Sequence, residues 1–541
     1  MRAVRAGGIL TFLTTLMFWG MGLAPAASTA AWGGGSTSHL CARSNVFCAE
    51  VASPYEKAAF GNKIVGHDEP SILFYSDKVG SGYRQHYTLR LPKDPPPTPI
   101  TGRSYTFELT PAFWFGLAMC ADQSAPDPGK TCKPDSDSNI VSNLNHAPGA
   151  AYMEMQFYPP GWVPFQEAGG ISCSSTQWCA ALNIDSYSEN MSTGQTLNQS
   201  CAKAVGVENV NFAFITKTGV PQGPPNPVQA TLADTYTPDA TKDLMMNPND
   251  LLSVNIFDTT NGLEIAIKDL TTHGVGKMVA SGRNGFGQVR FAPDPSTVCA
   301  NVPYNFHPMF ATSSPRTRVA WAAHSYNVAY DPETGHFDWC QGSPSGASIQ
   351  PGGACPSDAF EGPQTLSWSD YDDLDCADGT WSLRVQVSGC VGANYGFDGA
   401  AYLRDWPDGN TKLHPTPIKV SSPTFGATFT DQYSRIGFEV DTPRVEGTYC
   451  LRQSSGRGCT LVPLTDDGTP AAFYPFFSTV KEGTAGCFWA AGNKLPGGND
   501  FGGVKQYGKI FALPYPLNGA IQYRYNDYRS ILSSNPCPAK L

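Results

Sequence analysis

The sequence has few charged residues. Only 15% of its 541 residues are Asp, Glu, Lys or Arg, whereas about 25% is usual for globular proteins. Acidic residues outnumber basic ones by 46 to 36, so the basic excess typical of nucleic-acid binding is absent and that class is excluded. The chain also lacks a Cys-x-x-Cys pair, a Gly-x-Ser-x-Gly elbow, a phosphate-binding loop and a dinucleotide fingerprint. These absences argue against zinc-ribbon, thioredoxin-type, α/β-hydrolase and nucleotide-binding proteins.

The first 30 residues have the three regions of a secretory signal: a basic start at Arg2 and Arg5, an apolar stretch, and small residues up to Ala30. The apolar stretch has about the minimum length for a membrane span, and no positive cluster follows it. We therefore interpret residues 1–30 as a cleaved signal rather than an anchor. The mature protein is expected to be secreted and not embedded in a membrane.

All 16 cysteines follow this segment, and an even number in an exported chain indicates disulfides. Close spacing predicts local loops for Cys41 with Cys48, Cys120 with Cys132, Cys173 with Cys179, and Cys450 with Cys459.

Alternating apolar and polar residues predict an all-β protein. Residues 252–258 and 263–269 each place apolar side chains on one face, and Asn261-Gly262 between them predicts a β-hairpin turn. The same alternation recurs at 105–110, 210–216, 381–388 and 435–441. The segment 341–365 is rich in Gly, Ser and Pro and predicts a linker or long surface loop. We expect an antiparallel β-sandwich domain at 40–340 and a second β-rich domain at 366–541, both stapled by disulfides.

The stretch "AYMEMQFYPPGW" predicts the strand that is most informative about function. Met153, Met155 and Phe157 should face the core, because side chains alternate along a strand. The opposite face carries a carboxylate, an amide and two phenols, from Tyr152, Glu154, Gln156 and Tyr158. These groups suit binding of sugar hydroxyls or of a peptide backbone. The alternative is a solvated outer face with no ligand.

The segments "EMQFYP" and "NPNDLLSVNIFDTTNGLEIAIKDLTT" resemble motifs of the glutamic peptidases, or eqolisins. The resemblance implies a lectin-like, concanavalin-type β-sandwich (a jelly roll) and a glutamate that activates water beside a glutamine that holds the oxyanion. Glu154 and Gln156 are the only candidates for those catalytic roles. The family's Ala-Glu-Trp motif with a second glutamate is not visible, and the nearest segment, "RVAWAAHSYN", has no acid. The chain also resembles a group of uncharacterised exported proteins through segments such as "MQFYPPGW" and "FEVDTPRVEG".

Three of the nine histidines, His307, His324 and His336, fall within thirty residues. With Glu333 or Asp338 they could form a transition-metal site or an acid–base site. The alternative is structural: "DPETG" at 331–335 has the composition of a tight turn, which predicts a β-hairpin.

A run of carboxylates before Gly379 is a candidate calcium site, because calcium prefers oxygen ligands. Its members are Asp370, Asp372, Asp373, Asp375 and Asp378. The run does not fit the EF-hand pattern, so a solvated loop is the alternative. No cofactor is required by any motif.

Trp beside Asp is common in sugar-binding loops, which makes Asp405 and Trp406 candidate binding residues together with Tyr152, Tyr158 and Trp162. The leading hypothesis is therefore binding of an extracellular glycan or cell-wall polymer, with calcium as a candidate ion. A secreted hydrolase, either a glutamic-type peptidase or a glycosidase using paired carboxylates, is the second hypothesis. A structural envelope protein without an active site is the third.

Overall fold

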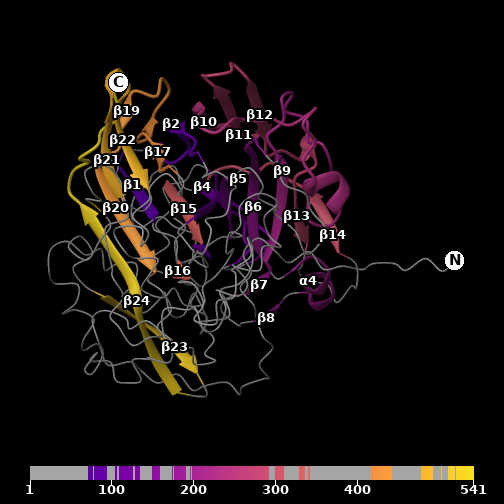
Figure 1. The fold of residues 1–541 in the computed structure, drawn as a ribbon. Coiled ribbons are helices and arrows are strands. Elements are labelled where there is room, and N and C mark those ends of the chain that lie inside the picture. The colour runs from indigo at the N-terminus through magenta and orange to yellow at the C-terminus, as the bar shows by residue number, and fades with distance from the viewer. Residues whose placement is uncertain are drawn as a thin grey trace, which may run out of the picture.

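The protein is described by a computed structural model, in which strands dominate (Figure 1). The structure describes residues 71–76, 78, 80–93, 104–105, 109–125, 128–134, 149–158, 173–174, 176–190, 195–196, 198–206, 208–290, 299–309, 328–335, 339–340, 416–441, 477–491, 501, 510–517 and 520–540. Within these ranges there is one α-helix, α4 (Gln199–Val205), with short π and 3₁₀ turns at Leu232–Tyr236, Gly282–Asn284 and Gly483–Ala485.

Most strands belong to two antiparallel sheets of nine strands each. The first, called sheet A, has the order β23 (Ile510–Leu517), β24 (Ala520–Leu532), β20 (Arg435–Asp441), β1 (Ser71–Tyr75), β15 (Ala329–Gly335), β4 (Leu109–Cys120), β5 (Ala150–Tyr158), β6 (Cys179–Tyr187), β9 (Glu208–Phe214). The second, called sheet B, has the order β12 (Val275–Val279), β11 (Gly262–Asp269), β10 (Leu251–Thr259), β2 (Arg84–Arg90), β17 (Ile418–Val420), β22 (Gly486–Ala491), β21 (Phe477–Glu482), with β18 (Thr424–Phe425) beside β2 and β19 (Asp431–Gln432) beside β18.

Three small two-stranded sheets complete the described strands. They pair β3 (Ser104–Tyr105) with β16 (Trp339–Cys340), β7 (Glu189–Asn190) with β8 (Gln195–Thr196), and β13 (Gly287–Arg290) with β14 (Ala300–Pro303).

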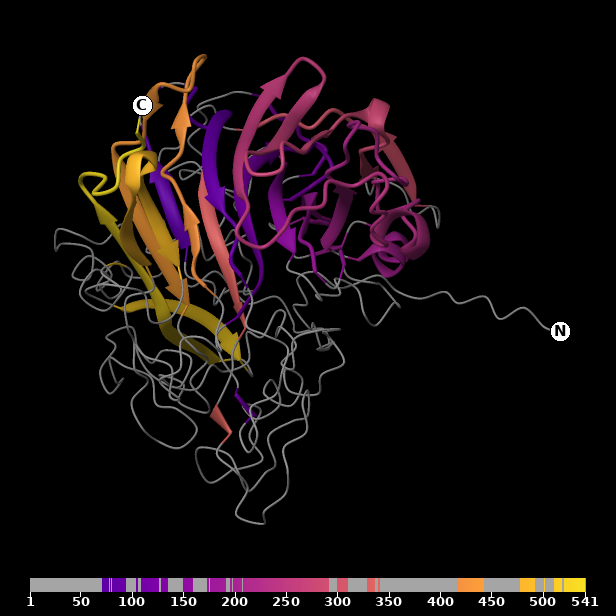
Figure 2. The ribbon, with the colours of Figure 1, turned by 45° about the horizontal axis from the view of Figure 1, so that its top comes forward.

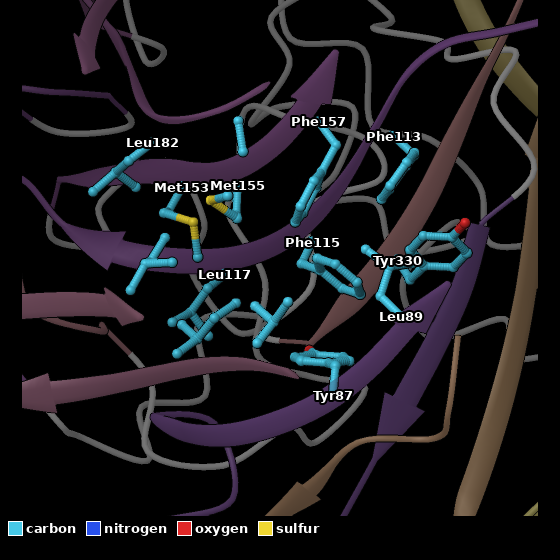
Figure 3. Packing of buried hydrophobic residues seen from close by; sticks show 14 of the residues in the cluster. Tyr87, Leu89, Phe113, Phe115, Leu117, Met153, Met155, Phe157, Leu182 and Tyr330 are labelled. Carbon is cyan, nitrogen blue, oxygen red and sulfur yellow. The ribbon is translucent and has the colours of Figure 1, made fainter. Parts of the chain in front are cut away.

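The inner faces of sheets A and B pack against each other and form one core. Figure 3 shows Met153, Met155 and Phe157 of sheet A on the side that faces Tyr87 and Leu89 of sheet B. The Tyr87 ring lies 4.2 Å from the ring of Phe115, centroid to centroid, and so joins the layers directly. The predicted antiparallel β-sandwich is therefore confirmed.

The hairpin predicted from residues 252–258 and 263–269 is present, as β10 and β11. Val254 pairs with Ile267 and Ile256 with Ile265 on the core face. Cross-strand pairs of β-branched residues stabilise such a hairpin by contact across the pleat. Gly262 closes the turn with a φ of 120°, a value that other residues rarely adopt.

Strands from distant parts of the sequence complete both sheets. β1 pairs with β20 through Ile72 opposite Phe438, and β2 pairs with β17 through Leu89 opposite Val420. Figure 2 shows the indigo and orange-to-yellow strands side by side. The expected boundary at 341–365 lies outside the described residues, and strands from either side of it share both sheets and one core.

The "DPETG" turn prediction was wrong. Asp331 to Gly335 belong to β15 and pair with β4, where Pro332 lies opposite Phe113. Proline lacks an N–H donor and is tolerated in a strand only where that donor is not needed. The described pairing of β15 with β1 ends at Tyr330, so the described residues pair Pro332 only with β4.

Four disulfides join described cysteines, and two of them confirm predicted local loops: Cys120–Cys132 and Cys173–Cys179. The others are Cys201–Cys299, which ties α4 to the residue before β14, and Cys487–Cys537, which ties β22 to the C-terminal segment. Disulfides are typical of proteins in oxidising compartments. None of the described helices is long and apolar enough to span a membrane.

Candidate functional site

The outer face of β5 carries a chain of hydrogen-bonded polar side chains. Gln156 Nε2 donates to Glu154 Oε2 at 2.5 Å, and the Tyr158 hydroxyl donates to Gln156 Oε1. Asn183 on the neighbouring strand β6 donates from Nδ2 to the Tyr158 hydroxyl oxygen at 3.4 Å. We call Glu154, Gln156, Tyr158 and Asn183 the polar row. Its members share one face because Asn183 lies opposite Glu154 in the register and the others are two residues apart on β5.

The polar row is buried. Glu154 is 4% exposed, and Gln156, Tyr158 and Asn183 are at most 1% exposed. The predicted division of β5 into a core face and a polar face is confirmed, but the alternative of a solvated outer face is wrong. Polar groups that are buried together need partners in the protein, which the hydrogen bonds within the row supply in part.

One atom of the polar row has no partner. Asn183 Oδ1 is inaccessible to solvent and accepts no hydrogen bond within the described structure. A buried acceptor without a donor costs about 1–3 kcal/mol, because the oxygen has lost its water and gained nothing in return. The polar row therefore has unused capacity to accept a hydrogen bond at Asn183.

Aromatic rings surround the polar row on the same face. Trp114 of β4 meets Tyr152 edge-on, with 5.6 Å between ring centroids, and Phe212 of β9 lies opposite Asn183 in the register. Gly116 makes room for this arrangement, because a Cβ atom there would lie 1.7 Å from the Tyr152 hydroxyl oxygen. A glycine is therefore required in the middle of β4, where it otherwise weakens a strand.

A second carboxylate lies near Glu154. Asp185 of β6 is 4% exposed and lies opposite Tyr152, which makes it the diagonal neighbour of Glu154 on the same face. Diagonal neighbours on adjacent antiparallel strands are about 7–8 Å apart. Paired carboxyl groups at about 5–10 Å are the separation that glycosidases use.

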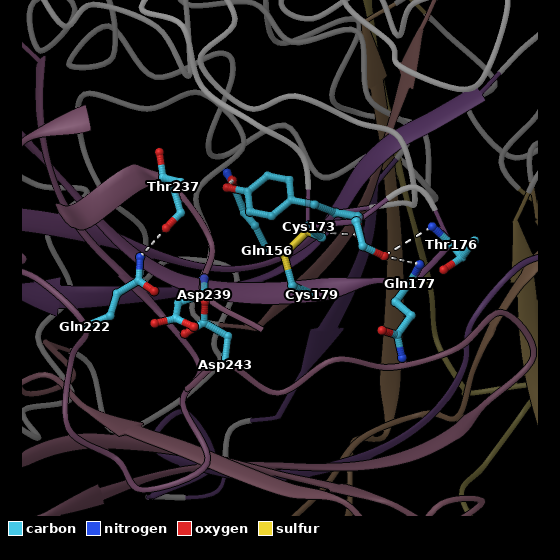
Figure 4. Close-up of a disulfide and its surroundings, with 11 residues drawn as sticks. Gln156, Cys173, Thr176, Gln177, Cys179, Gln222, Thr237, Asp239 and Asp243 are labelled. Atoms are coloured by element: carbon cyan, nitrogen blue, oxygen red, sulfur yellow. Dashed lines mark hydrogen bonds between the residues drawn. A yellow bond between two sulfur atoms is a disulfide. The ribbon is translucent and has the colours of Figure 1, made fainter. Parts of the chain in front are cut away.

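A disulfide holds one end of the polar row. Cys179 lies opposite Tyr158 in the register and is bonded to Cys173, whose sulfur contacts the Tyr158 carbonyl oxygen at 3.9 Å (Figure 4). Ser174 in this short loop accepts hydrogen bonds from the backbone N–H groups of Thr176 and Gln177. The loop before β6 is therefore fixed both covalently and by hydrogen bonds.

His307 does not join a histidine cluster within the described structure. Its Nδ1 atom lies 2.9 Å from Asp258 Oδ1 and 3.1 Å from Oδ2, an ion pair if the ring is protonated. No group of three potential metal ligands occurs among the described residues. The other predicted site residues lie outside them: Trp162, His324, His336, Asp338, Asp370, Asp372, Asp373, Asp375, Asp378, Asp405 and Trp406.

Sequence reasoning missed Asn183 and Asp185. Both lie in "CAALNIDSY", where Leu182 and Ile184 face the core and the polar residues alternate with them. That alternation was a usable signal, but the pairing of β6 with β5 was not visible in the sequence.

Comparisons with known proteins give no match: no family model, no curated protein and no solved structure matches the chain. The resemblance to glutamic peptidases therefore rests on the sequence motifs alone.

Proposed function

We propose that the protein is exported and binds an extracellular glycan or other cell-surface polymer at the polar row of sheet A. The signal-like N-terminus supports export, and disulfides between described cysteines fit an oxidising compartment. A carboxylate, an amide and a phenol in one hydrogen-bonded chain, bordered by aromatic rings, are groups that bind sugar hydroxyls.

The observation that carries the proposal is the unpaired acceptor, Asn183 Oδ1. A sugar hydroxyl that enters the buried row can donate to this oxygen and at the same time accept a hydrogen bond from a neighbouring N–H or O–H group. Because the row is buried, a ligand group that does not donate this hydrogen bond leaves Asn183 Oδ1 unpaired, and the free-energy cost of burying that oxygen remains. Such a site discriminates between hydroxyl-bearing ligands and analogues that lack the hydroxyl.

A glycan array with and without a chelator tests the proposal on the mature protein. The Asn183→Leu variant keeps the branched shape and the number of side-chain heavy atoms and removes the amide, so binding of the recognised glycans should be lost. Asn301→Leu is the matched control, because Asn301 Oδ1 is also buried without a partner but belongs to β14. Loss of signal with chelator would support calcium as an accessory ion. Equal signals for wild type and Asn183→Leu would refute the proposal.

A hydrolase is the second candidate, favoured by the diagonal placement of Glu154 and Asp185. In a glycosidase, one carboxyl group would protonate the leaving oxygen and the other would act as base or nucleophile. In a glutamic-type peptidase, Glu154 would activate water and Gln156, which already contacts it, would hold the oxyanion. Hydrolysis of casein at acidic pH, compared between wild type and Glu154→Ala, tests the peptidase form, and an unchanged rate would eliminate Glu154 from it.

A further inference from the structure

The outer face of sheet B carries an arginine enclosed by two aromatic rings. Arg84 of β2 lies between Phe257 of β10 and Phe429 of the β18–β19 loop, and its guanidinium carbon is 5.5 Å from each ring centroid. His86, two residues further along β2, packs its ring against Phe429 at 5.9 Å between centroids. The four side chains come from three separate segments of the chain, which the sheet brings together.

The charge of Arg84 has no counterion in the described structure. Its Nε atom is buried without a hydrogen-bond partner, and no carboxylate pairs with the guanidinium. Arg90, on the same strand and the same face, is paired with Glu482 at 3.1 Å. The two rings attract the guanidinium through cation–π contacts, and an anion bound to it would add a charge-assisted hydrogen bond that the described structure does not supply.

Uncharged polar groups lie beside Arg84. His86 Nδ1 is 3.1 Å from Asn255 Oδ1, and Thr424 lies opposite His86 in the β18–β2 register. Thr424 Oγ1 is buried and has no hydrogen-bond partner in the described structure. Burial lowers the pKa of His86, although the Asn255 hydrogen bond opposes this effect. Arg84 is therefore the cation of the group, with an amide, an imidazole and a free hydroxyl around it.

Phe429 is held in an unfavourable backbone conformation. Its φ angle is 55°, in the left-handed region that bulky side chains rarely adopt. Such strain persists only where surrounding contacts compensate for it, and it is concentrated at functional sites. Here the ring contacts with Arg84 and His86 are the compensating contacts.

We propose that Arg84, His86, Asn255, Phe257, Thr424 and Phe429 form a second binding site, for the carboxylate of an acidic sugar. The planar guanidinium matches a carboxylate with two parallel hydrogen bonds. The threonine hydroxyl and the asparagine amide are suited to the sugar hydroxyls, and the phenyl rings provide apolar walls. The site lies on the opposite sheet from the polar row and does not depend on it.

The acidic groups near the site are few. Glu264 of β11 lies opposite Phe257 in the register, and Asp431 of β19 is paired with Lys78 at 2.6 Å. Among the described residues, no Lys or Arg pairs with Glu264, so its negative charge beside Phe257 should weaken anion binding. The Glu264→Gln variant is therefore expected to bind a uronate at least as tightly as wild type.

Isothermal calorimetry of the full mature chain with a trigalacturonate, its methyl ester and acetate tests the proposal. Trigalacturonate should bind, whereas the uncharged methyl ester and acetate should bind at least about tenfold more weakly, since each lacks one part of the ligand. Arg84→Gln should weaken trigalacturonate binding by about tenfold or more, and Arg84→Lys should give a smaller loss because it keeps the charge without the planar fork.

Arg90→Gln is the matched control, since Arg90 shares the strand and the face but already has a carboxylate partner. It should leave trigalacturonate binding unchanged, as should Asn183→Leu in the polar row. Near-ultraviolet circular dichroism would verify that each variant is folded. Equal binding of acid and ester, equal losses for the Arg84 and Arg90 variants, or no binding of trigalacturonate would each overturn the proposal.

Discussion

Gln156 donates a 2.5 Å hydrogen bond to the carboxylate of Glu154, two residues away on the same face of β5. The same glutamine accepts a hydrogen bond from the Tyr158 hydroxyl, so one amide joins a carboxylate to a phenol. Because both neighbours are buried, the hydrogen bonds of Gln156 replace part of the hydrogen bonding that bulk water would otherwise supply.

Replacing Gln156 by leucine should therefore destabilise the protein by about 2–5 kcal/mol, because it deprives a buried carboxylate and a buried hydroxyl of a partner. Urea unfolding would measure the loss. Gln432→Leu serves as the control, since Gln432 Nε2 makes one hydrogen bond, to the Ala539 carbonyl oxygen. The control should lose about 0.5–1.5 kcal/mol. Equal losses for the two variants would contradict the role assigned to Gln156.

Asp250 and Asp269 form a carboxyl pair at the base of the β10–β11 hairpin. Burial and the contact with Asp269 raise the pKa of Asp250. Burial also acts to raise the pKa of Asp269, but hydrogen bonds from Thr272 and Thr271 outweigh it and the pKa is lowered. Asp250, whose pKa is raised, stabilises the fold at low pH, and this contribution is lost as the pH rises through its pKa in the folded protein. Asp269, whose pKa is lowered, stabilises the fold above the pKa of an unfolded Asp, about 4. This contribution is lost as the pH falls through its pKa in the folded protein.

The pair should therefore be most stabilising in mildly acidic solution, where one proton is shared. The Asp250→Asn variant can still donate to Asp269 but cannot ionise, so its stability should fall less than that of wild type as pH rises from about 4 towards 7. Urea unfolding across this range would measure the difference. Parallel pH profiles for the two proteins would contradict the shared-proton arrangement.

Asp243 should make the stability of the fold depend on pH in a second way. Its carboxyl group is fully buried, and burial raises its pKa to about 7, although the hydrogen bond from the Asp239 N–H acts in the opposite direction. A raised pKa gives stability below pH ~4 that is lost, by up to about 1.4 kcal/mol per pH unit, until the folded pKa is reached.

The Asp243→Asn variant cannot ionise, so it should not lose stability in this way as the pH rises. Its amide oxygen can still accept the hydrogen bond from the Asp239 N–H. Thermal unfolding at pH 5 and pH 8 would compare the two proteins. The variant should be stabilised relative to wild type at pH 8 more than at pH 5. A constant difference would show that Asp243 does not titrate in this range.

The Cys201–Cys299 disulfide spans 98 residues. Closing a loop of about 100 residues restricts the unfolded chain enough to stabilise the fold by about 4.7 kcal/mol in the chain-entropy model. The double variant Cys201→Ser, Cys299→Ser should lose roughly this amount in urea unfolding. The same change at Cys173 and Cys179, which are six residues apart, should cost only about 2–3 kcal/mol. A larger loss at the short loop would contradict this account.

Local features of the fold could be predicted from the sequence, and long-range pairing could not. The β10–β11 hairpin and the two faces of β5 follow from alternation and turn residues close together in the chain. The pairing of β1 with β20 depends on contacts between distant segments that leave no local pattern. For the same reason "DPETG" was misassigned, because its composition predicts a turn but its pairing with β4 makes it a strand.

The candidate site was found only in part. Glu154, Gln156 and Tyr158 were predicted as a group because they alternate along a single strand. Asn183 and Asp185 join the group only because β6 pairs with β5 in this register. Gly116 contributes by leaving space for the Tyr152 side chain. The enclosure of Arg84 by Phe257 and Phe429 likewise depends on which strands are neighbours in sheet B.

The central claim is that the polar row binds a glycan through Asn183. Its most direct test is the calorimetric affinity of the strongest array-selected glycan for wild type, Asn183→Leu and Asn301→Leu. We predict that Asn183→Leu binds about tenfold or more weakly, since a hydrogen bond in a buried site is lost, and that Asn301→Leu matches wild type. Equal affinities for all three proteins, or no glycan bound by wild type, would contradict the claim.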